Sequence, residues 1–307
     1  MLSDLTARVW QRLIARESLA DLRLPLTEEG RIDLRGLVAP QPSIAREYQT
    51  AVADVKALAN VIEIRGGNWK GIDFSDGRLK SLRFFDSKIE DCRFDRAVCQ
   101  DWRIWGTAVS NTSFRSADLR RSALGGIDNG KRNSFRKIDF AYTDLRQTVH
   151  KSADFIDCTF CDTNLTKVDF WGSVFVNCSF EGDLNQVLFH RYAFRGEAFP
   201  PNEMKGVDFR RARFHFVEFR ELDMDDVKWP EGDEHILLED YRATLERALK
   251  VFRARPDTQS KAMAAIFEHK LKWAGPNQER GIVSKRDLIE VGGDEAVNEF
   301  LQLAGNE

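Results

Sequence analysis

Large apolar side chains recur at every fifth residue through the middle of the chain. Between 155 and 180 the series is Phe155, Phe160, Leu165, Phe170, Phe175 and Phe180. A smaller residue stands two positions before each of them, at Ala153, Cys158, Thr163, Val168, Ser173 and Cys178. Because a helix repeats at about 3.6 residues and a strand at about 2, a sustained period of five indicates an internal repeat.

The period of five holds over three runs, which are 69–124, 135–180 and 189–229. Its phase slips across 125–134 and again across 181–188. Asp or Asn often stands directly before the large residue, where a short polar side chain can bond the backbone of a bend. The remaining positions are mostly polar or charged, which is typical of a surface that faces water.

A unit of five residues cannot bury its own apolar side chains, so the pattern predicts units that coil and stack on one another. In each unit one large and one small side chain would point inward. If four units make one square turn, large residues about twenty apart lie above one another. Allowing for the slips, we expect one column of the structural core to be Phe74, Phe94, Phe114, Phe135, Phe155, Phe175, Phe194 and Phe214.

These units resemble the pentapeptide-repeat family, in which the repeat has the form A(D/N)LXX. Close matches are SADFI at 152–156, SADLR at 116–120 and RRARF at 210–214. The resemblance implies a mainly β fold, a right-handed quadrilateral parallel β-helix, with the α-helical flanks described next. At a coil spacing of about 4.8 Å, about eight coils would make a rod about 38 Å long.

Both ends of a solenoid expose core and unpaired backbone, so they need caps. We therefore predict three parts: an N-terminal helical cap at 1–65, the β-helix at 66–229 and a C-terminal helical region at 230–307. The helical patterns lie at 3–22, 43–60, 235–255, 258–275 and 284–304, the last with a break at Gly292-Gly293. Short strands are expected at 31–37 and around Ile62 and Ile64, ahead of the first full coil.

The composition adds few constraints. The chain has 307 residues, a formal net charge of −3 and 42% hydrophobic residues, which is ordinary for a globular protein without a bias toward nucleic acid or lipid. The first residues contain no cleavable apolar core, and no run of 18 apolar residues occurs, so we expect a cytoplasmic protein with no membrane attachment.

Candidate chemistry is sparse, and we predict a protein that is not an enzyme and needs no cofactor or metal. Cys158 and Cys161 have the spacing of a metal or redox pair, but the repeat places Cys158 inside the tube and Cys161 outside. His150 occupies an inward large position, which favours a core histidine. An interior filled with phenylalanine leaves no pocket in which catalytic groups could converge.

The resemblance to the quinolone-resistance group within the family implies a rod that mimics duplex DNA and binds a type II topoisomerase, DNA gyrase or topoisomerase IV. The charge between 66 and 229 is close to neutral, with 26 Lys and Arg against 25 Asp and Glu. An acidic section nevertheless stands out, and it makes a candidate interaction surface of Asp154, Asp157, Asp162, Asp169, Glu181 and Asp183. Residues 115–151 are instead basic, but acidic turns are interleaved there, which disfavours direct nucleic-acid binding.

Two further features bear on function. In the topoisomerase-binding relatives, loops that project from the coils contribute to activity, and the candidates here are 125–134, 181–188 and 195–206. The alternative function is a general protein-interaction scaffold or effector, in which the helices of 230–307 bind a partner or form a homodimer. The sequence alone does not decide between these functions.

Overall fold

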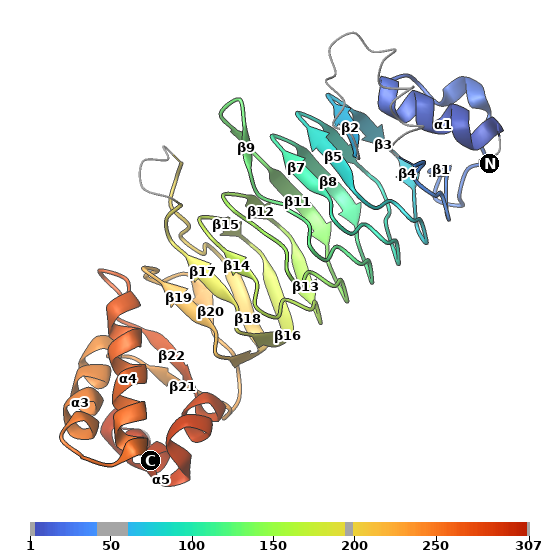
Figure 1. Ribbon diagram of the computed structural model, residues 1–307. Helices are drawn as coiled ribbons and strands as arrows, with labels where there is room; N and C mark the ends of the chain where they lie inside the picture. Colours follow the sequence, from blue (N-terminus) through green and yellow to red (C-terminus); the bar gives the residue numbers. More distant parts are fainter. Residues whose placement is uncertain (1–3, 42–60, 194–198, 306–307) are drawn as a thin grey trace.

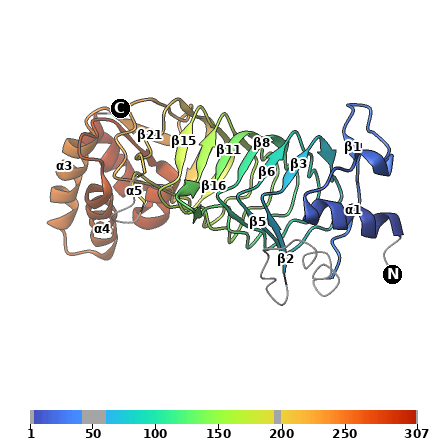
Figure 2. The ribbon, with the colours of Figure 1, turned by 90° about the horizontal axis from the view of Figure 1, so that it is seen from above.

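A computed structural model describes residues 4–41, 61–193 and 199–305. The molecule is a rod of stacked coils with helices at both ends (Figure 1), and the same shape is seen from above in Figure 2. The middle of the rod is the predicted four-sided parallel β-helix, so the fold class is confirmed. None of the described helices is long and apolar enough to cross a membrane.

Parallel strands stacked coil upon coil form the sides of the tube. A 10-stranded sheet covers two neighbouring sides and contains β3 (Asn68–Lys70), β6 (Lys88–Glu90), β8 (Ala108–Ser113), β11 (Ser134–Asp139), β12 (Asp154–Ile156), β13 (Thr159–Cys161), β15 (Val174–Val176), β16 (Ser179–Asn185), β18 (Val207–His215) and β20 (Val227–Lys228). The third side carries β2 (Ile62–Arg65), β5 (Leu82–Phe85) and β7 (Arg103–Trp105), and further along β14 (Asp169–Phe170), β17 (Leu188–His190) and β19 (Glu218–Arg220). Single bridges such as Arg78 to Val98 and Val98 to Asp118 hold the fourth side together.

Phenylalanine rings stack face to face along the interior. The longest column is Phe74, Phe94, Phe114, Phe140, Phe160, Phe180 and Phe209, with centroids of successive rings 5.1, 4.9, 5.7, 5.0, 4.6 and 4.9 Å apart. Apart from Phe114, which is 2% exposed, each of these side chains is at most 1% exposed. Burial of such rings is the main source of stability in this tube.

The prediction that all eight phenylalanines form one column is wrong for the residues after Phe114. Phe135 pairs with Val109, 26 residues earlier (135 − 109), and stacks with Phe155 at 5.1 Å in a second column that continues to Phe175. Phe214 pairs with Leu184 in a third column. Phe194 lies outside the described residues, whereas the other seven predicted side chains are buried. The physical reason is that 125–134 adds six residues to a coil rather than one.

The short acidic residues before the large positions bond the backbone at the bends, as the pattern indicates. Asp73 accepts from the N–H of Ser75 at 2.8 Å, and Asp118 accepts from that of Arg120 at 3.1 Å. The residue two positions after the large one adopts a left-handed conformation at most corners, for example Asp76 with φ 61°. Asp, Asn and Gly tolerate this conformation best, which explains why they are frequent there.

The N-terminal end is capped by helix α1 (Asp4–Ala15) and a 3-10 turn, η1 (Ala20–Leu22). Trp10 of α1 packs edge-on against Trp69 of the first coil at 6.4 Å. The strand expected at 31–37 is β1 (Ile32–Asp33), which pairs in parallel with β4 (Ile72–Asp73) as part of an extra coil. The helix predicted at 43–60 lies outside the described residues.

The C-terminal end is closed by three helices, α3 (Tyr241–Arg253), α4 (Thr258–Trp273) and α5 (Lys285–Ala304). Helix α5 is kinked at Gly293, whose φ is 76°, so the expected break is present. The helix predicted to begin at 235 is wrong in its first turn, because β21 (His235–Leu238) forms a strand there. It pairs antiparallel with β22 (Gly281–Ser284), and this pairing covers the end of the tube.

Candidate protein-interaction surface

The structure does not gather the six acidic residues of the sequence prediction into one face. Asp154 and Asp157 belong to the side of β12, Asp169 to the side of β14, and Asp162, Glu181 and Asp183 to the region around β13 and β16. Five of the six lie within 4.0 Å of a basic group: Asp154 by Arg132 (3.0 Å), Asp157 by Arg136 (3.9 Å), Asp169 by His190 (3.1 Å), Glu181 by Arg211 (2.9 Å) and Asp183 by Arg213 (2.8 Å).

Pairing and burial act differently on these carboxyl groups. The hydrogen bond from Arg213 holds the pKa of Asp183 below its ordinary value. Burial raises the pKa of Asp154, although the nearby Arg132 acts against this effect. A surface whose carboxylates are paired in this way presents little unbalanced negative charge to a partner.

Two insertions leave the tube at the same edge, which we call the loop edge. It is the edge where the side of β14 and β17 turns into the side of β12 and β15. The first insertion leaves after Leu124 and returns at Phe135, while the second leaves after Phe189 and returns at Met204. The third candidate loop, 181–188, is not a loop, since these residues lie largely in β16 and β17.

The first insertion is a hairpin of β9 (Ile127–Asp128) and β10 (Lys131–Arg132), which stands above the coils in Figure 1. Its Arg132 side chain is 6% exposed and donates to the carbonyl oxygens of Ser152 and Gly172, both at 2.9 Å. The same guanidinium lies 5.1 Å from the ring centre of Phe199 in the second insertion. One side chain therefore links the hairpin, two successive coils and the second insertion.

Both insertions return to the tube through a buried asparagine at the small inward position. Asn133 accepts from the N–H of Thr107 at 3.0 Å and donates to the carbonyl of Leu124 at 2.8 Å. Asn202 accepts from the N–H groups of Phe175 and Met204, both at 3.1 Å. These amides replace backbone bonds that the insertion interrupts, so the loops rest on a rigid base.

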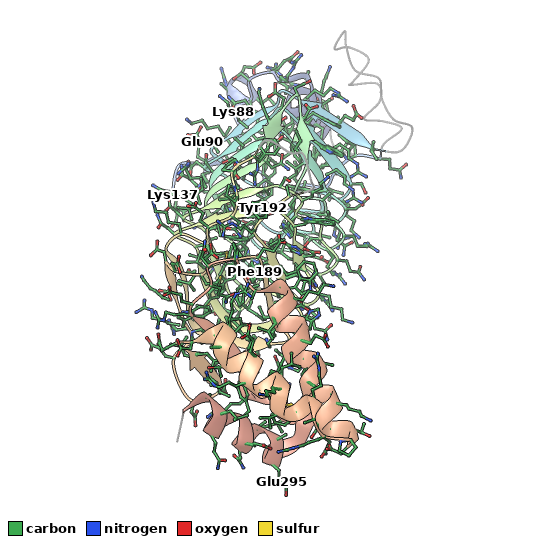
Figure 3. The ribbon with its side chains drawn as sticks, turned by 90° about the vertical axis from the view of Figure 1, so that its left-hand side faces the viewer. Lys88, Glu90, Lys137, Phe189, Tyr192 and Glu295 are labelled. Atoms are coloured by element: carbon green, nitrogen blue, oxygen red, sulfur yellow. The ribbon has the colours of Figure 1, made fainter. Side chains whose placement is uncertain are left out.

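Exposed aromatic and apolar side chains lie on the coils between the insertions and beside them. Val149, Trp171 and Tyr192 are 54%, 37% and 50% exposed. The Trp171 ring stacks on His190 with centroids 5.8 Å apart, and the Arg191 guanidinium lies 5.6 Å from the Tyr192 ring centre. In Figure 3, Tyr192 lies near the middle of the view, whereas Lys88, Glu90 and Lys137 lie toward its left-hand border.

The cysteine pair and the histidine considered as candidate chemistry in the sequence have the positions that the repeat predicts for structural side chains. Cys158 is buried and its thiol lies 3.3 Å from the carbonyl oxygen of Phe135, whereas Cys161 is partly exposed on the other side of the wall. His150 is fully buried with its Nε2 2.7 Å from the Thr148 hydroxyl. Within 4–41, 61–193 and 199–305, no three His, Cys, Asp or Glu side chains form a group that could hold a metal ion.

The C-terminal helices form an apolar core of their own, with Leu245, Phe252, Phe267 and Phe300 at 0% exposure. Among the described residues after Trp229, Ile289 is the one large apolar side chain that is clearly exposed, at 42%. Little apolar surface is therefore left on these helices for the homodimer that the sequence suggested.

Comparison with known proteins agrees with the repeat. The family model for pentapeptide repeats matches residues 151–182. Among curated proteins, none matches the sequence.

Solved structures of pentapeptide-repeat proteins align with about half of the chain. A trypsin-treated form of QnrB1, a plasmid-mediated fluoroquinolone resistance protein, is 18% identical, with 51% of this chain and 82% of that chain covered and a TM-score of 0.23. HetL of the cyanobacterium Nostoc sp. strain PCC 7120, involved in heterocyst differentiation regulation, is 14% identical over 54% and 86% of the two chains, with a TM-score of 0.28. Rfr23 of the cyanobacterium Cyanothece 51142 is 13% identical over 54% and 90%, with a TM-score of 0.22.

The period of five, the four-sided coils and the match of the family model agree. The repeat region of this chain is a pentapeptide-repeat β-helix.

Proposed function

We propose that this protein is a non-enzymatic rod that binds another protein through the loop edge. The observation that carries the proposal is the common placement of both insertions on one edge, where Arg132 joins them to the coils. Exposed Trp171 and Tyr192 offer the kind of amphipathic side chain that dominates protein interfaces. A loop surface on a rigid scaffold is also a frequent place for binding residues.

The first partner to test is a type II topoisomerase, DNA gyrase or topoisomerase IV, because the resemblance to the quinolone-resistance group implies it. Contact through the loop edge supports such binding better than mimicry of DNA does, since four of the six acidic residues have an arginine within 4.0 Å. The proposal therefore treats the loops, and not a negative surface, as the origin of affinity.

The test measures supercoiling by each topoisomerase, with and without a fluoroquinolone, over a range of concentrations of the purified protein. We expect protection of the enzyme by the wild type and at least a tenfold higher half-effective concentration for Tyr192→Ser. Tyr142→Ser is the matched control, because Tyr142 is 54% exposed and lies 5.5 Å from a guanidinium, but on a different corner.

Two outcomes count against the proposal. An absence of any effect at micromolar protein removes topoisomerases as partners. A photo-crosslinking residue placed at 192 or at 142 then tests the broader proposal in cells. Equal crosslinking from both positions would contradict binding through the loop edge.

A further inference from the structure

Three of the five histidines lie where the C-terminal helices meet the last coils of the tube. His215 ends β18, His235 begins β21 and His269 belongs to α4. Histidine is the side chain that changes its charge between about pH 5 and pH 8. The fold therefore gathers most of these titratable groups at one junction.

His215 faces a carboxylate with each of its ring nitrogens. Its Nδ1 lies 3.0 Å from Asp287 and its Nε2 lies 3.7 Å from Glu290, and both carboxylates belong to α5. The second oxygen of Asp287 accepts from the N–H of Phe216 at 2.9 Å, which fixes this carboxylate beside the ring. A neutral imidazole has one N–H and donates to one of the two carboxylates, whereas the protonated ring has a donor for each.

His269 makes a second contact of this kind. Its Nε2 lies 3.2 Å from Glu218 of β19, which also lies 2.8 Å from Arg220. Burial acts to raise the pKa of Glu218, but hydrogen bonds from His269 and Arg220 outweigh it and hold the pKa below its ordinary value. Among the described residues, every ion pair within 4.0 Å that joins 61–229 to 235–305 has a histidine as its basic partner.

The other charges around these histidines oppose one another. Apart from Asp287 and Glu290, the charged side chains around His215 are Asp183, Asp233, Glu234, Arg213, Lys285 and Arg286. Beside His269, the cation of Lys270 stands with the same Asp287. Acidic and basic groups are equally frequent in this surrounding set, so the direct partners decide what a proton on each ring does.

His235 acts differently from the other two. Its Nε2 accepts from the N–H of Phe214 at 3.0 Å, which requires a ring nitrogen without a proton. Burial lowers the pKa of His235, so its ring stays neutral to a lower pH than an ordinary histidine does. The bond to Phe214 therefore persists while His215 and His269 gain a proton.

We propose that these pairs form a pH-sensitive clasp, which holds the C-terminal helices to the tube when His215 and His269 carry a proton. A histidine ordinarily titrates at about pH 6.5, whereas carboxylates stay ionised down to about pH 4. The clasp is therefore complete at about pH 6 and is lost as the pH rises toward about 8. It is independent of the function proposed above, because it does not involve the loop edge.

The test measures amide hydrogen exchange of the full-length protein at pH 6.0 and pH 8.0, corrected for the intrinsic effect of pH on exchange. The probes are the N–H of Phe216, which donates to Asp287, and the N–H of Glu221, which donates to the carbonyl of Trp273 at 2.7 Å. Both bonds join the tube to the helices, so their protection reports the docked state. In the wild type we expect protection about fivefold higher at pH 6.0.

Three variants assign this difference to the clasp. The double variant His215→Gln and His269→Gln keeps an N–H donor at each position but carries no charge, so its protection should differ less than about twofold between the two pH values. Glu290→Gln changes a side chain that is 56% exposed and should reduce the difference without affecting folding. His190→Gln is the matched control, because His190 lies 3.1 Å from Asp169 within the tube, and it should keep the full difference.

The proposal is overturned by equal protection at both pH values in the wild type, or by a difference that persists in the double variant. It is also overturned if His190→Gln removes as much of the difference as the double variant does, because the effect would then belong to the tube as a whole. Should the double variant not fold, an unchanged difference in Glu290→Gln overturns the proposal in its place.

Discussion

At the scale of single residues, the direction of each side chain follows from its place in the unit of five. The sequence predicts Cys158 inside and Cys161 outside, and the structure has them so. The buried Asn133 and Asn202 were missed, although each breaks the pattern of small residues two positions before the large one. Such an amide at an inward position is a signal, readable from sequence, that an insertion returns to the coil there.

His150 is the residue whose chemistry is least suited to its position. It lies between Leu124 and Phe170 in its column, and burial lowers its pKa to about 3. In the unfolded chain the imidazole of His150 has an ordinary pKa of about 6.5. Between about pH 3 and pH 6.5 the unfolded chain therefore binds a proton that the folded protein excludes. Stability should fall as the pH is lowered through 6.5 toward 3.

Because the folded protein excludes this proton from His150, we expect the free energy of unfolding to be lower by about 2 kcal/mol at pH 5. His150→Leu, which matches the neighbouring Leu124, should remove that part of the acid sensitivity. Urea unfolding at pH 7.5 and pH 5 measures it, and the difference between variant and wild type should grow at the lower pH. A difference that stays constant between the two pH values would show that His150 is not excluded from protonation.

At the scale of elements, the sequence predicts the units but not which side of the square each unit occupies. An insertion of six residues shifts the phase of a five-residue pattern by one position, and an insertion of one residue would produce the same shift. The ten extra residues before Met204 are a multiple of five, so they leave the phase unchanged. Phe135 was therefore assigned to the column of Phe114, and Phe199 to the core. In the structure Phe135 pairs with Val109, and Phe199 lies against Arg132 instead.

The helical flanks illustrate a second limit. Apolar residues at 236–238 continue the stripe of α3, so the sequence alone favours a longer helix. The strand β21 forms there because β22, more than forty residues later, offers a pairing partner at the open end of the tube. Such long-range pairing overrides local propensity and cannot be read from a short window.

The stacked columns lead to a prediction at this scale. Phe155 is 0% exposed and stacks at 5.1 Å on both Phe135 and Phe175. Phe155→Ala leaves a cavity that neighbouring coils cannot close, and we expect a loss of about 3–5 kcal/mol in the free energy of unfolding.

Phe155→Leu is the control, because it keeps most of the volume and should cost clearly less. Urea denaturation followed by circular dichroism measures both variants. Equal, small losses for the two variants would mean that adjacent coils repack, which is contrary to the rigid stacking described above.

At the scale of the whole molecule, opposite charges alternate along the surface and neutralise each other. Short ion pairs join residues within a unit, such as Arg146 to Asp144 at 2.7 Å, and residues one coil apart, such as Arg96 to Asp76 at 2.7 Å. The chain has 46 Lys and Arg against 49 Asp and Glu, a net charge of −3, so basic residues are numerous enough to pair with most of the carboxylates. Two explanations of binding, mimicry of DNA by the acidic residues and contact through the loop edge, differ in how strongly the affinity depends on salt.

A mimic of DNA whose affinity comes from unpaired carboxylates should bind much more weakly at 200 mM than at 50 mM salt, because salt screens the attraction between these charges and the partner. Binding through aromatic side chains of the loop edge should lose much less affinity, about threefold. Such contacts depend little on charged groups, and only interactions between charges are screened by salt. Titration of the identified partner at both salt concentrations measures this loss. The double variant Asp157→Asn and Asp183→Asn should bind as the wild type does, while Tyr192→Ser should weaken binding at both concentrations. A steep salt dependence together with weak binding of the double variant would instead assign the affinity to the acidic residues, and the loop edge would then be a structural feature of the coil.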